Sequence, residues 1–288
     1  MIPAPFDYHA PTSLDEALAL LARLTSSGQD VKVLGGGQSL LPVLRLRMAA
    51  PEVLVDLNQV AELRGVREED DAIVIGAMTT HDTMTRDPLV RRHALLLALA
   101  EQTVADPQVR HRGTFGGALV HADPASDIPS SALALDATMV VAGPSGRRTV
   151  AAADFFEDLF TTAVGEDELL VEVRVPKHTG WGAAYEKFTR ISHSWSMVGV
   201  AAAVRVEGGK IAEAKVGLTN MGSVPIRARA VEAALVGQPA TADVVRRAAA
   251  AAGEGTSPPS DANADADYRL HLAQVLTGRA VLTAAGEH

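Results

Sequence analysis

Two glycine-rich segments hold the residues of this chain that are best suited to bind an anion. Each segment has five members: Gly35, Gly36, Gly37, Gln38 and Ser39 in the first loop, and Gly113, Thr114, Phe115, Gly116 and Gly117 in the second. Glycine lets a ligand approach the backbone closely, and the N–H groups of a glycine turn between a strand and a helix converge on negative charge. Such amide donors, with the hydroxyls of Ser39 and Thr114, can take the place of whole positive charges. We therefore expect the two loops to hold a diphosphate between them.

The first loop has three other interpretations. Gly35 and Gly37 match part of the dinucleotide fingerprint G-x-G-x-x-G, with Asp56 about 20 residues further on, but Leu40 stands where the third glycine belongs. A Walker phosphate loop is excluded because the chain has no Gly-Lys-Ser or Gly-Lys-Thr. For this loop alone a turn without a ligand stays open, since glycine clusters often mark turns. The second glycine loop favours the anion site.

The segment His-Ala-Asp-Pro-Ala-Ser-Asp at 121–127 also carries groups that could do chemistry. His121, Asp123 and Asp127 could converge on a metal, although no further ligand is obviously paired with them. Asp123 and Ser126 equally fit a turn and a helix cap. A third interpretation makes the segment a hydrogen-bonding partner for cofactor hydroxyls, and the residues alone do not decide among the three.

Composition narrows the class of protein. With 288 residues, 47% hydrophobic residues and a formal charge of −9, the chain is a globular, acidic protein. Nucleic acid is not an expected partner, because neutralising the many phosphates of a nucleic-acid backbone needs clustered Lys and Arg, which this chain lacks. The absence of cysteine excludes a disulfide, a thiolate nucleophile and a cysteine-held iron–sulfur cluster on this chain. No apolar run is long enough for a transmembrane segment and no signal peptide is recognisable, so we expect a cytoplasmic protein.

The elements that must position the loops follow an α+β pattern. A capping box beginning at Ser13 predicts a helix with an apolar face from Leu14 to Leu24. Strands are expected at 31–34, 53–57, 72–78 and 168–176, a hairpin at 138–151, and helices at 40–48, 88–103 and 130–136, with a turn-rich region at 105–129.

From residue 178 the pattern changes to antiparallel strands with a turn at 207–210. Helices are expected at 228–236, 241–252 and 268–284, and a polar loop without packing content at 253–267. The last helix is expected to present one apolar face made of Tyr268, Leu272, Val275, Leu276 and Leu282.

Three stretches of the sequence resemble the FAD-binding medium subunit of molybdenum hydroxylases, the family of xanthine dehydrogenase and aerobic carbon monoxide dehydrogenase. They are VLGGGQSLLPVL at 33–44, ADPQVRHRGTFGGALVHADPASDIP at 105–129 and YEKFTRISHSWSMVGVAAAV at 185–204. Two glycine motifs in this order and at this separation are more specific than either alone. The resemblance covers essentially the whole chain.

The resemblance implies an α+β fold with a two-subdomain FAD-binding region of the vanillyl-alcohol oxidase class, followed by a C-terminal antiparallel sheet with helices. The implied FAD-binding domain is 1–177, with subdomains at about 1–57 and 58–177, and the C-terminal domain is 178–288. Residues 35–39 match the family's first diphosphate loop residue by residue. The residues that match the second loop are Thr114, Phe115, Gly116, Gly117 and Ala118.

The resemblance also assigns residues near the flavin. Asp127 matches an acid that hydrogen-bonds the flavin side of the cofactor, at a ribityl hydroxyl, and Leu170 falls where the family packs an apolar residue. Lys187 matches a lysine close to the ring, where a cation favours the reduced cofactor. Trp195 falls where carbon monoxide dehydrogenase-like subunits place a tyrosine. From the residues alone, Lys187 could instead be an exposed strand residue and Trp195 a core tryptophan.

The chain departs from the common pattern of carbon monoxide dehydrogenase subunits at three places, which involve four residues. The first loop commonly reads Ala-Gly-Gly-His-Ser, whereas this chain has Gly35 and Gln38 in those places. Ala118 replaces a common Asn, and Trp195 replaces Tyr. Backbone groups do most of the work of FAD binding, so these differences bear on the substrate of the complex rather than on the cofactor.

The function implied by the resemblance is electron transfer through FAD to an external acceptor. The molybdenum cofactor would lie on a large subunit and two [2Fe-2S] clusters on a small subunit, in a dimer of heterotrimers that partners could hold at the inner face of the membrane. The best match is a carbon monoxide dehydrogenase, with a heteroaromatic or aldehyde hydroxylase as the alternative. A stand-alone flavin oxidase and a non-enzymatic nucleotide-binding module are the two other hypotheses. No catalytic residue and no metal ligand is assigned to this chain.

Overall fold

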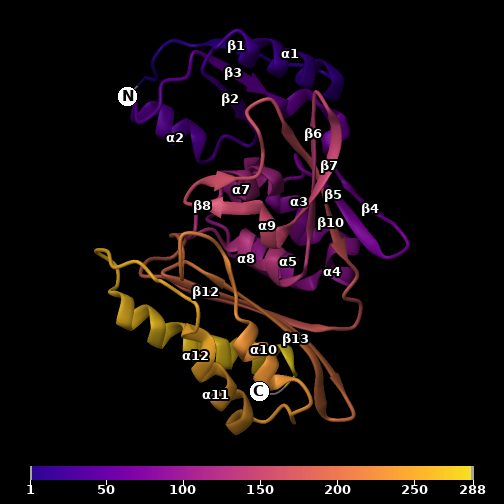
Figure 1. The fold of residues 1–288 in the computed structure, drawn as a ribbon, viewed down its shortest axis with the longest axis vertical. Helices are drawn as coiled ribbons and strands as arrows, with labels where there is room; N and C mark the ends of the chain where they lie inside the picture. Colours follow the sequence, from indigo (N-terminus) through magenta and orange to yellow (C-terminus); the bar gives the residue numbers. More distant parts are fainter. Residues whose placement is uncertain (1, 287–288) are drawn as a thin grey trace.

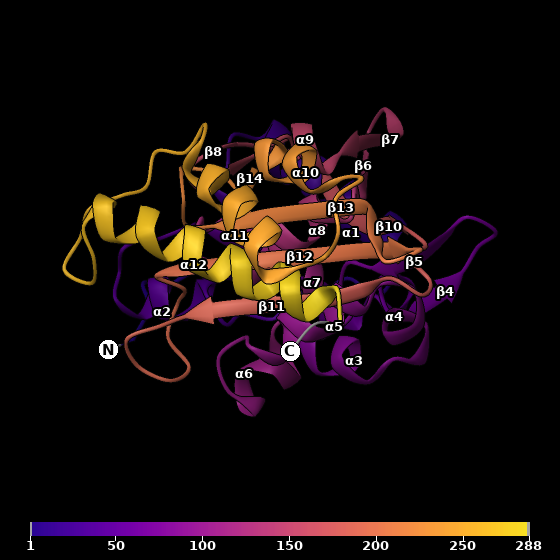
Figure 2. The ribbon, with the colours of Figure 1, turned by 90° about the horizontal axis from the view of Figure 1, so that it is seen from below.

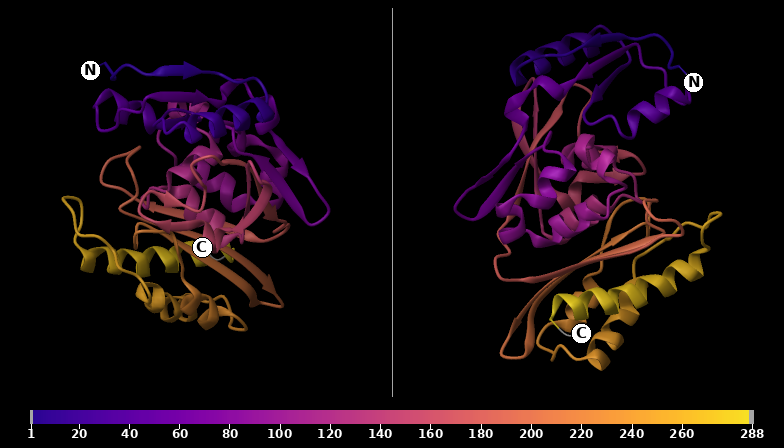
Figure 3. Two further views of the ribbon diagram at one scale, coloured as in Figure 1. Left: turned by 45° about the horizontal axis from the view of Figure 1, so that its top comes forward. Right: turned by 180° about the vertical axis from the view of Figure 1, so that it is seen from behind.

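A computed structural model describes residues 2–286 of the chain, which fold into three regions stacked along the long axis (Figures 1 and 3). The N-terminal region is a parallel sheet in the order β1-β3-β2, formed by Asp7–His9, Val53–Asp56 and Val31–Leu34. Helix α1 (Leu14–Ser26) buries Leu14, Ala17, Leu21 and Leu24, and the Ser13 side chain accepts a hydrogen bond from the Glu16 N–H, which confirms the predicted cap. Helix α2 (Leu40–Arg45) follows the first glycine loop.

The middle region is an antiparallel sheet with helices on it. Its strand order is β4-β5-β10-β6-β7, formed by Val66–Glu68, Ala72–Gly76, Leu169–Pro176, Thr138–Gly143 and Gly146–Ala151. Its helices are α3 (His81–Arg86), α4 (Pro88–His93), α5 (Leu95–Gln102), α6 (Pro107–Arg112), α7 (Phe115–His121), α8 (Asp127–Ala134) and α9 (Ala152–Phe155). A small hairpin, β8 (Phe156–Asp158) and β9 (Thr161–Thr162), lies beside α7 (Figure 1).

The C-terminal region is an antiparallel sheet of β11 (Gly182–Phe188), β12 (Val198–Glu207), β13 (Lys210–Thr219) and β14 (Ile226–Arg227). Helices α10 (Arg229–Leu235), α11 (Ala242–Ala249) and α12 (Ala266–Ala284) cover the face that Figure 2 shows. Helices α5 and α8 of the middle region contact the sheet as well. Alternate residues of a strand point to opposite faces, so Val200 and Ala202 join the C-terminal core while Ala201 and Ala203 join the middle one.

The domain boundaries at 57 and 177 stay predictions. The three larger sheets occupy 7–56, 66–176 and 182–227, and within residues 2–286 no strand of these sheets crosses either boundary.

The single helix expected at 88–103 is wrong. The chain leaves the helical conformation at Ala94 (φ −144°, ψ 49°), which separates α4 from α5. The carbonyl of His93, which a continuous helix would use internally, accepts a hydrogen bond from the His178 N–H at 2.8 Å. A contact across 85 residues of sequence therefore decides this break.

The region expected to be turn-rich, 105–129, contains two short helices that the sequence analysis missed. Helix α6 begins after Asp106 and α7 after Thr114, and each of these two side chains accepts a hydrogen bond from a backbone N–H in the first turn of its helix. The cap residues were readable in the sequence, but helices of 6 and 7 residues carry almost no periodic signal.

The predicted face of the last helix is also only partly right. Leu272 and Leu276 are buried, but Tyr268 is exposed, and the buried face includes Arg269, Ala273, Thr277 and Ala280.

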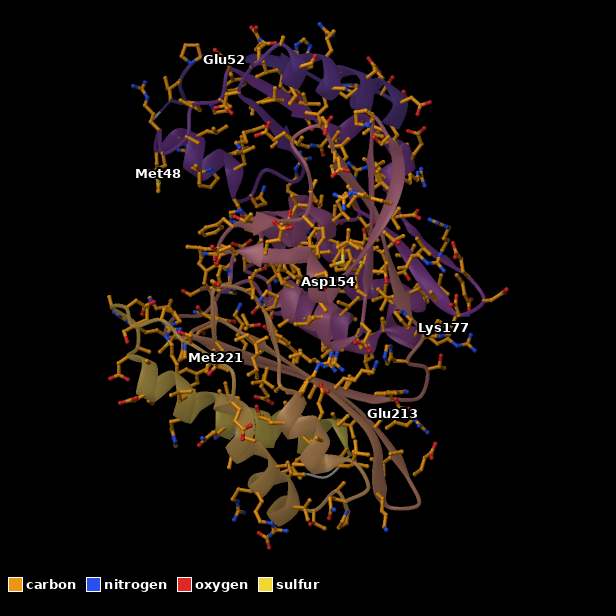
Figure 4. All side chains as sticks on the ribbon, viewed as in Figure 1. Met48, Glu52, Asp154, Lys177, Glu213 and Met221 are labelled. Atoms are coloured by element: carbon orange, nitrogen blue, oxygen red, sulfur yellow. The ribbon has the colours of Figure 1, made fainter. Side chains whose placement is uncertain are left out.

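The polar loop at 253–267 packs against the molecule, contrary to expectation. The Ser257 N–H donates to the carbonyl of Met221, a buried residue labelled in Figure 4 at the C-terminal sheet. Asp261 pairs with the guanidinium of Arg269 at 2.8 Å, and Ala264 is buried. Long polar side chains and backbone groups anchor this loop without an apolar cluster of its own.

Gly278, in the middle of α12, offers a test of the C-terminal region. A Cβ at this position would meet only the Ala249 Cβ, at an ordinary 3.9 Å, and the backbone is helical. We expect Gly278→Ala to raise the free energy of unfolding by roughly 0.5–1 kcal/mol, because alanine loses less conformational entropy in a helix. Urea denaturation monitored by circular dichroism measures this change, and a destabilised variant would contradict the packing of α12 on α11.

Candidate functional site

The first glycine loop presents a row of free hydrogen-bond donors. It connects the end of β2 to the start of α2, and Gly37 has φ +76°, a conformation that favours glycine. The backbone N–H groups of residues 35–39 have no acceptor within residues 2–286. The Ser39 hydroxyl makes no capping bond, while Gln38 Nε2 donates to the Gly36 carbonyl at 3.1 Å. Five amide donors and one hydroxyl are therefore available to an anion.

The two glycine loops lie directly against each other. A Cβ on Gly36 would stand 2.2 Å from the Arg112 carbonyl oxygen and 2.5 Å from the Gly113 Cα. A Cβ on Gly35 would be 3.1 Å from the Thr114 Oγ1. Only glycine fits at position 36, because both obstacles are backbone atoms. The structure thus brings together the two loops that the sequence analysis paired.

The second loop differs from the first in how its donors are used. The Phe115 N–H donates to Thr79 O at 2.9 Å and the Gly116 N–H to Ala77 O at 2.8 Å. Gly117 and Ala118 donate to the Oγ1 and the carbonyl of Thr114. Within residues 2–286, only the Thr114 N–H of residues 114–118 lacks an acceptor. We expected several amide donors to be available here, but the N–H groups of residues 115–118 form hydrogen bonds that hold the loop in place.

The Phe115 backbone anchors the second loop, because its N–H donates to Thr79 O. The Phe115 side chain is fully buried in the core of the middle region, as is most of Leu170 on β10. The predicted contacts of these two residues and of the other loop residues with a cofactor stay predictions.

Asp127 is the centre of a buried polar network. Its Oδ1 accepts hydrogen bonds from the Tyr185 hydroxyl at 2.7 Å and the Ser196 hydroxyl at 2.6 Å. Its Oδ2 forms an ion pair with Lys187 Nζ at 2.6 Å, and the same ammonium donates to Thr103 O at 3.0 Å. All three partners of the carboxylate come from the C-terminal region, so this network links the two regions. The predicted hydrogen bond from Asp127 to a ribityl hydroxyl stays a prediction.

Lys187 is not the exposed strand residue that the sequence left open. Its side chain is 11% exposed, and two of its three N–H bonds are used by Asp127 and Thr103. One donor remains for a further acceptor.

Burial, followed by the negative charge of Asp127, raises the pKa of the Tyr185 phenol well above 10. The folded chain therefore keeps this phenol protonated at a pH where the unfolded chain ionises it, so folding stability falls as pH rises above 10. Absorbance titration of the three tyrosines should show one that ionises only when the protein unfolds. The Tyr185→Phe variant should lose that delayed step, and simple titration of Tyr185 in the folded chain would contradict its burial.

Trp195 is 55% exposed, which rules out a core tryptophan. It lines a cavity of about 510 Å³ together with Asp123, Met197, Asn220 and Arg269. The next residue fixes its backbone, because the Ser196 hydroxyl donates to Asp127 and the Asn220 side chain donates to the Ser196 carbonyl. The contact of this indole with the flavin stays a prediction.

The segment 121–127 forms a turn, as one of the three interpretations expected. The Asp123 carboxylate accepts a hydrogen bond from the Ala125 N–H at 2.9 Å, and α8 begins right after Ser126. Ser126 itself makes no capping bond. Within residues 2–286 no group of three His, Asp or Glu side chains is arranged to hold a metal ion.

Family comparisons identify the class of the protein. Residues 4–178 match the model described as the FAD binding domain in molybdopterin dehydrogenase. Residues 183–284 match the model of the CO dehydrogenase flavoprotein C-terminal domain. The chain is therefore an FAD-binding protein of the α+β class, and it belongs to the family of FAD-binding subunits of molybdenum hydroxylases.

Individual relatives agree with this family. The carbon monoxide dehydrogenase medium chain of Hydrogenophaga pseudoflava is 43% identical over 98% of this chain and 97% of the relative. A solved structure of carbon monoxide dehydrogenase from the same organism, which lacks the Mo-pyranopterin moiety of the molybdenum cofactor, superposes with a TM-score of 0.95 at 45% identity, covering 99% of both chains. Quinoline 2-oxidoreductase from Pseudomonas putida 86 superposes with a TM-score of 0.93 at 34% identity, again covering 99% of both chains.

The residues present fit FAD. A dinucleotide needs donors for two phosphates and backbone that leaves room for them, and the first loop offers free N–H groups at residues 35–39. The second loop adds the Thr114 N–H and a glycine-rich backbone that is anchored by hydrogen bonds to the carbonyls of Ala77 and Thr79. No lysine or arginine is required for this arrangement.

Proposed function

We propose that this chain is the electron-transfer subunit of a carbon monoxide dehydrogenase-type complex. The likeness to a carbon monoxide dehydrogenase medium chain over 98% of this chain and 97% of that relative carries the proposal. Bound FAD supplies the redox chemistry, taking up electrons from a partner's [2Fe-2S] clusters and giving them to an external acceptor. The absence of cysteine supports this arrangement, because the clusters need ligands from another chain.

In this proposal the chain's own residues bind and orient the cofactor. The N–H groups of residues 35–39 and Thr114 hold the diphosphate. The free donor of Lys187 supplies positive charge on the flavin side, and Asp127 fixes that ammonium in place. No residue needs to act as a general acid or base on the organic substrate, since that chemistry belongs to the molybdenum site of another subunit.

The proposed assembly contains a large molybdenum-binding subunit and a small iron–sulfur subunit, arranged as a dimer of heterotrimers. The naming of the relative as a medium chain supports the two partners. No helix among residues 2–286 is long and apolar enough to cross a membrane. A cytoplasmic location, with attachment to the inner face of the membrane through partners, stays a prediction.

A heteroaromatic or aldehyde hydroxylase is the second candidate. The observation behind it is that Gly35, Gln38, Ala118 and Trp195 all depart from the common carbon monoxide dehydrogenase pattern. The 34% identity to quinoline 2-oxidoreductase shows that the same fold serves such an enzyme.

Affinity purification of the chain from its native cells tests the proposal. We expect two co-purifying chains, one of them with cysteine motifs for [2Fe-2S] clusters, together with flavin, iron and molybdenum. Carbon monoxide, quinoline and an aldehyde are then offered in turn as reductants of the purified complex. A colourless chain that purifies without partners and refuses added FAD contradicts the proposal.

A further inference from the structure

Asn58 supports the first glycine loop from outside. Its side-chain amide donates to the Gly35 carbonyl at 3.0 Å. Asp56 fixes the orientation of Asn58, because its Oδ1 accepts from the Asn58 N–H at 2.9 Å and from Asn58 Nδ2 at 2.6 Å. The other carboxylate oxygen of Asp56 accepts from the Tyr8 hydroxyl at 2.7 Å. A chain of three polar side chains from β1 and the end of β3 therefore reaches the start of the loop.

Arg64 connects this support to the second glycine loop. Its Nη2 donates to the Asn58 carbonyl at 3.0 Å and its Nη1 to the Met78 carbonyl at 3.2 Å. Met78 lies between Ala77 and Thr79, and the carbonyls of these two neighbours accept the N–H groups of Gly116 and Phe115. One guanidinium therefore spans the supports of both loops.

We propose that Asn58 and Arg64 are positioning residues that set the distance between the two glycine loops and thereby the affinity for FAD. This inference rests on the FAD binding of the proposed function. The two loops are closely packed where they meet, since a Cβ on Gly36 would stand 2.2 Å from the Arg112 carbonyl oxygen. Donors must lie near 2.9 Å from a phosphate oxygen, so a shift of the loops by about 1 Å breaks several hydrogen bonds at once.

The location of Arg64 separates this role from core packing. Arg64 is an exposed residue and Asn58 is only partly buried, so neither side chain fills the core. Besides its hydrogen bond to Asp56, Asn58 donates to the Gly35 carbonyl, and Arg64 donates to the carbonyls of Asn58 and Met78, which lie next to the supports of the two loops. Removing either side chain is expected to change the position of a loop while leaving the apolar core intact.

The test uses five variants of the full chain: two single substitutions, their double variant and two controls. Arg64→Met and Asn58→Asp remove the donors. Arg67→Met is the control for the lost arginine, because Arg67 is exposed and its ion-pair partners within residues 2–286 are Glu69 and Glu172. Gln59→Glu is the control for the added negative charge, because Gln59 is exposed and adjoins Asn58.

The measured quantities are the FAD dissociation constant, the rate of FAD release from the loaded chain and the melting temperature. We expect Arg64→Met and Asn58→Asp each to weaken FAD binding about ten-fold, the loss that follows from removing hydrogen bonds that hold the supports of the loops. The controls should bind FAD like the wild type. The double variant should lose less FAD affinity than the product of the two single losses, because both residues act on the same distance between the loops.

The possible outcomes separate the two levels of the proposal. A wild-type chain that does not bind FAD overturns the proposed function itself. If the wild type binds FAD and both test variants bind it as tightly as their controls, the positioning role of Asn58 and Arg64 is overturned while the proposed function stands. Lower melting temperatures with unchanged FAD affinity and release rate would assign Asn58 and Arg64 a merely structural role. If the loss of FAD affinity in the double variant equals the product of the two single losses, the two residues act independently, which contradicts a shared positioning role.

Discussion

Asp127→Asn is expected to lower the free energy of unfolding by about 3–5 kcal/mol. The carboxylate receives the ammonium of Lys187 and the hydroxyls of Tyr185 and Ser196, and it is only 4% exposed. An amide at this position leaves the Lys187 charge buried without a counter-charge, which costs more than the ion pair contributes when intact. Urea denaturation of the wild type and the variant measures the difference.

Asp82→Asn is the matched control for this prediction. Asp82 also forms an ion pair, but its partner Arg86 is 73% exposed, so solvent screens the interaction. We expect the control to change the free energy of unfolding by less than about 1 kcal/mol. Equal effects of the two substitutions would show that the Asp127 network does not link the middle and C-terminal regions as its hydrogen bonds indicate.

Gly36→Ala is expected to weaken FAD binding by on the order of 100-fold. The new methyl group would collide with the Arg112 carbonyl oxygen and the Gly113 Cα, at 2.2 and 2.5 Å. Neither obstacle is the flexible end of a side chain, so the two loops must move apart. Their donors then no longer converge on one diphosphate. Titration of the FAD-free chain with FAD, followed by flavin fluorescence, measures the loss.

Gly278→Ala serves as the control, because it adds the same methyl group in α12, where only the Ala249 Cβ lies within reach at 3.9 Å. This variant should bind FAD as tightly as the wild type. If Gly36→Ala also keeps wild-type affinity, the contact between the loops does not determine the cofactor site.

The glycine loops could be predicted from the sequence because their signal is local. A short apolar strand, successive glycines and a following helix define the first loop within 32–47, and the second loop repeats the chemistry. The division of labour between the loops could not be predicted. It depends on the carbonyls of Ala77 and Thr79, which lie in the turn between β5 and α3 and accept the N–H groups of Gly116 and Phe115.

The Asp127 network had no local signal at all. Its partners Tyr185, Lys187 and Ser196 are 58, 60 and 69 residues away in the sequence, and the packing of β11 and of the segment before β12 on the middle region brings them together. The break at Ala94 has the same origin, because His178 binds the carbonyl that a continuous helix would use. The buried Arg269 likewise stands in a helix whose periodicity predicted Tyr268 as the packed residue.

Reduction of the flavin by substrate, in the complex and in the isolated chain, tests the central claim most directly. The chain loaded with FAD and the purified complex are mixed without oxygen with the substrate of the complex, and the flavin absorbance is followed. We predict that the flavin bleaches in the complex and stays oxidised in the isolated chain, because electrons reach it only through the partners. Bleaching in the isolated chain would contradict this account and identify a stand-alone flavin oxidase.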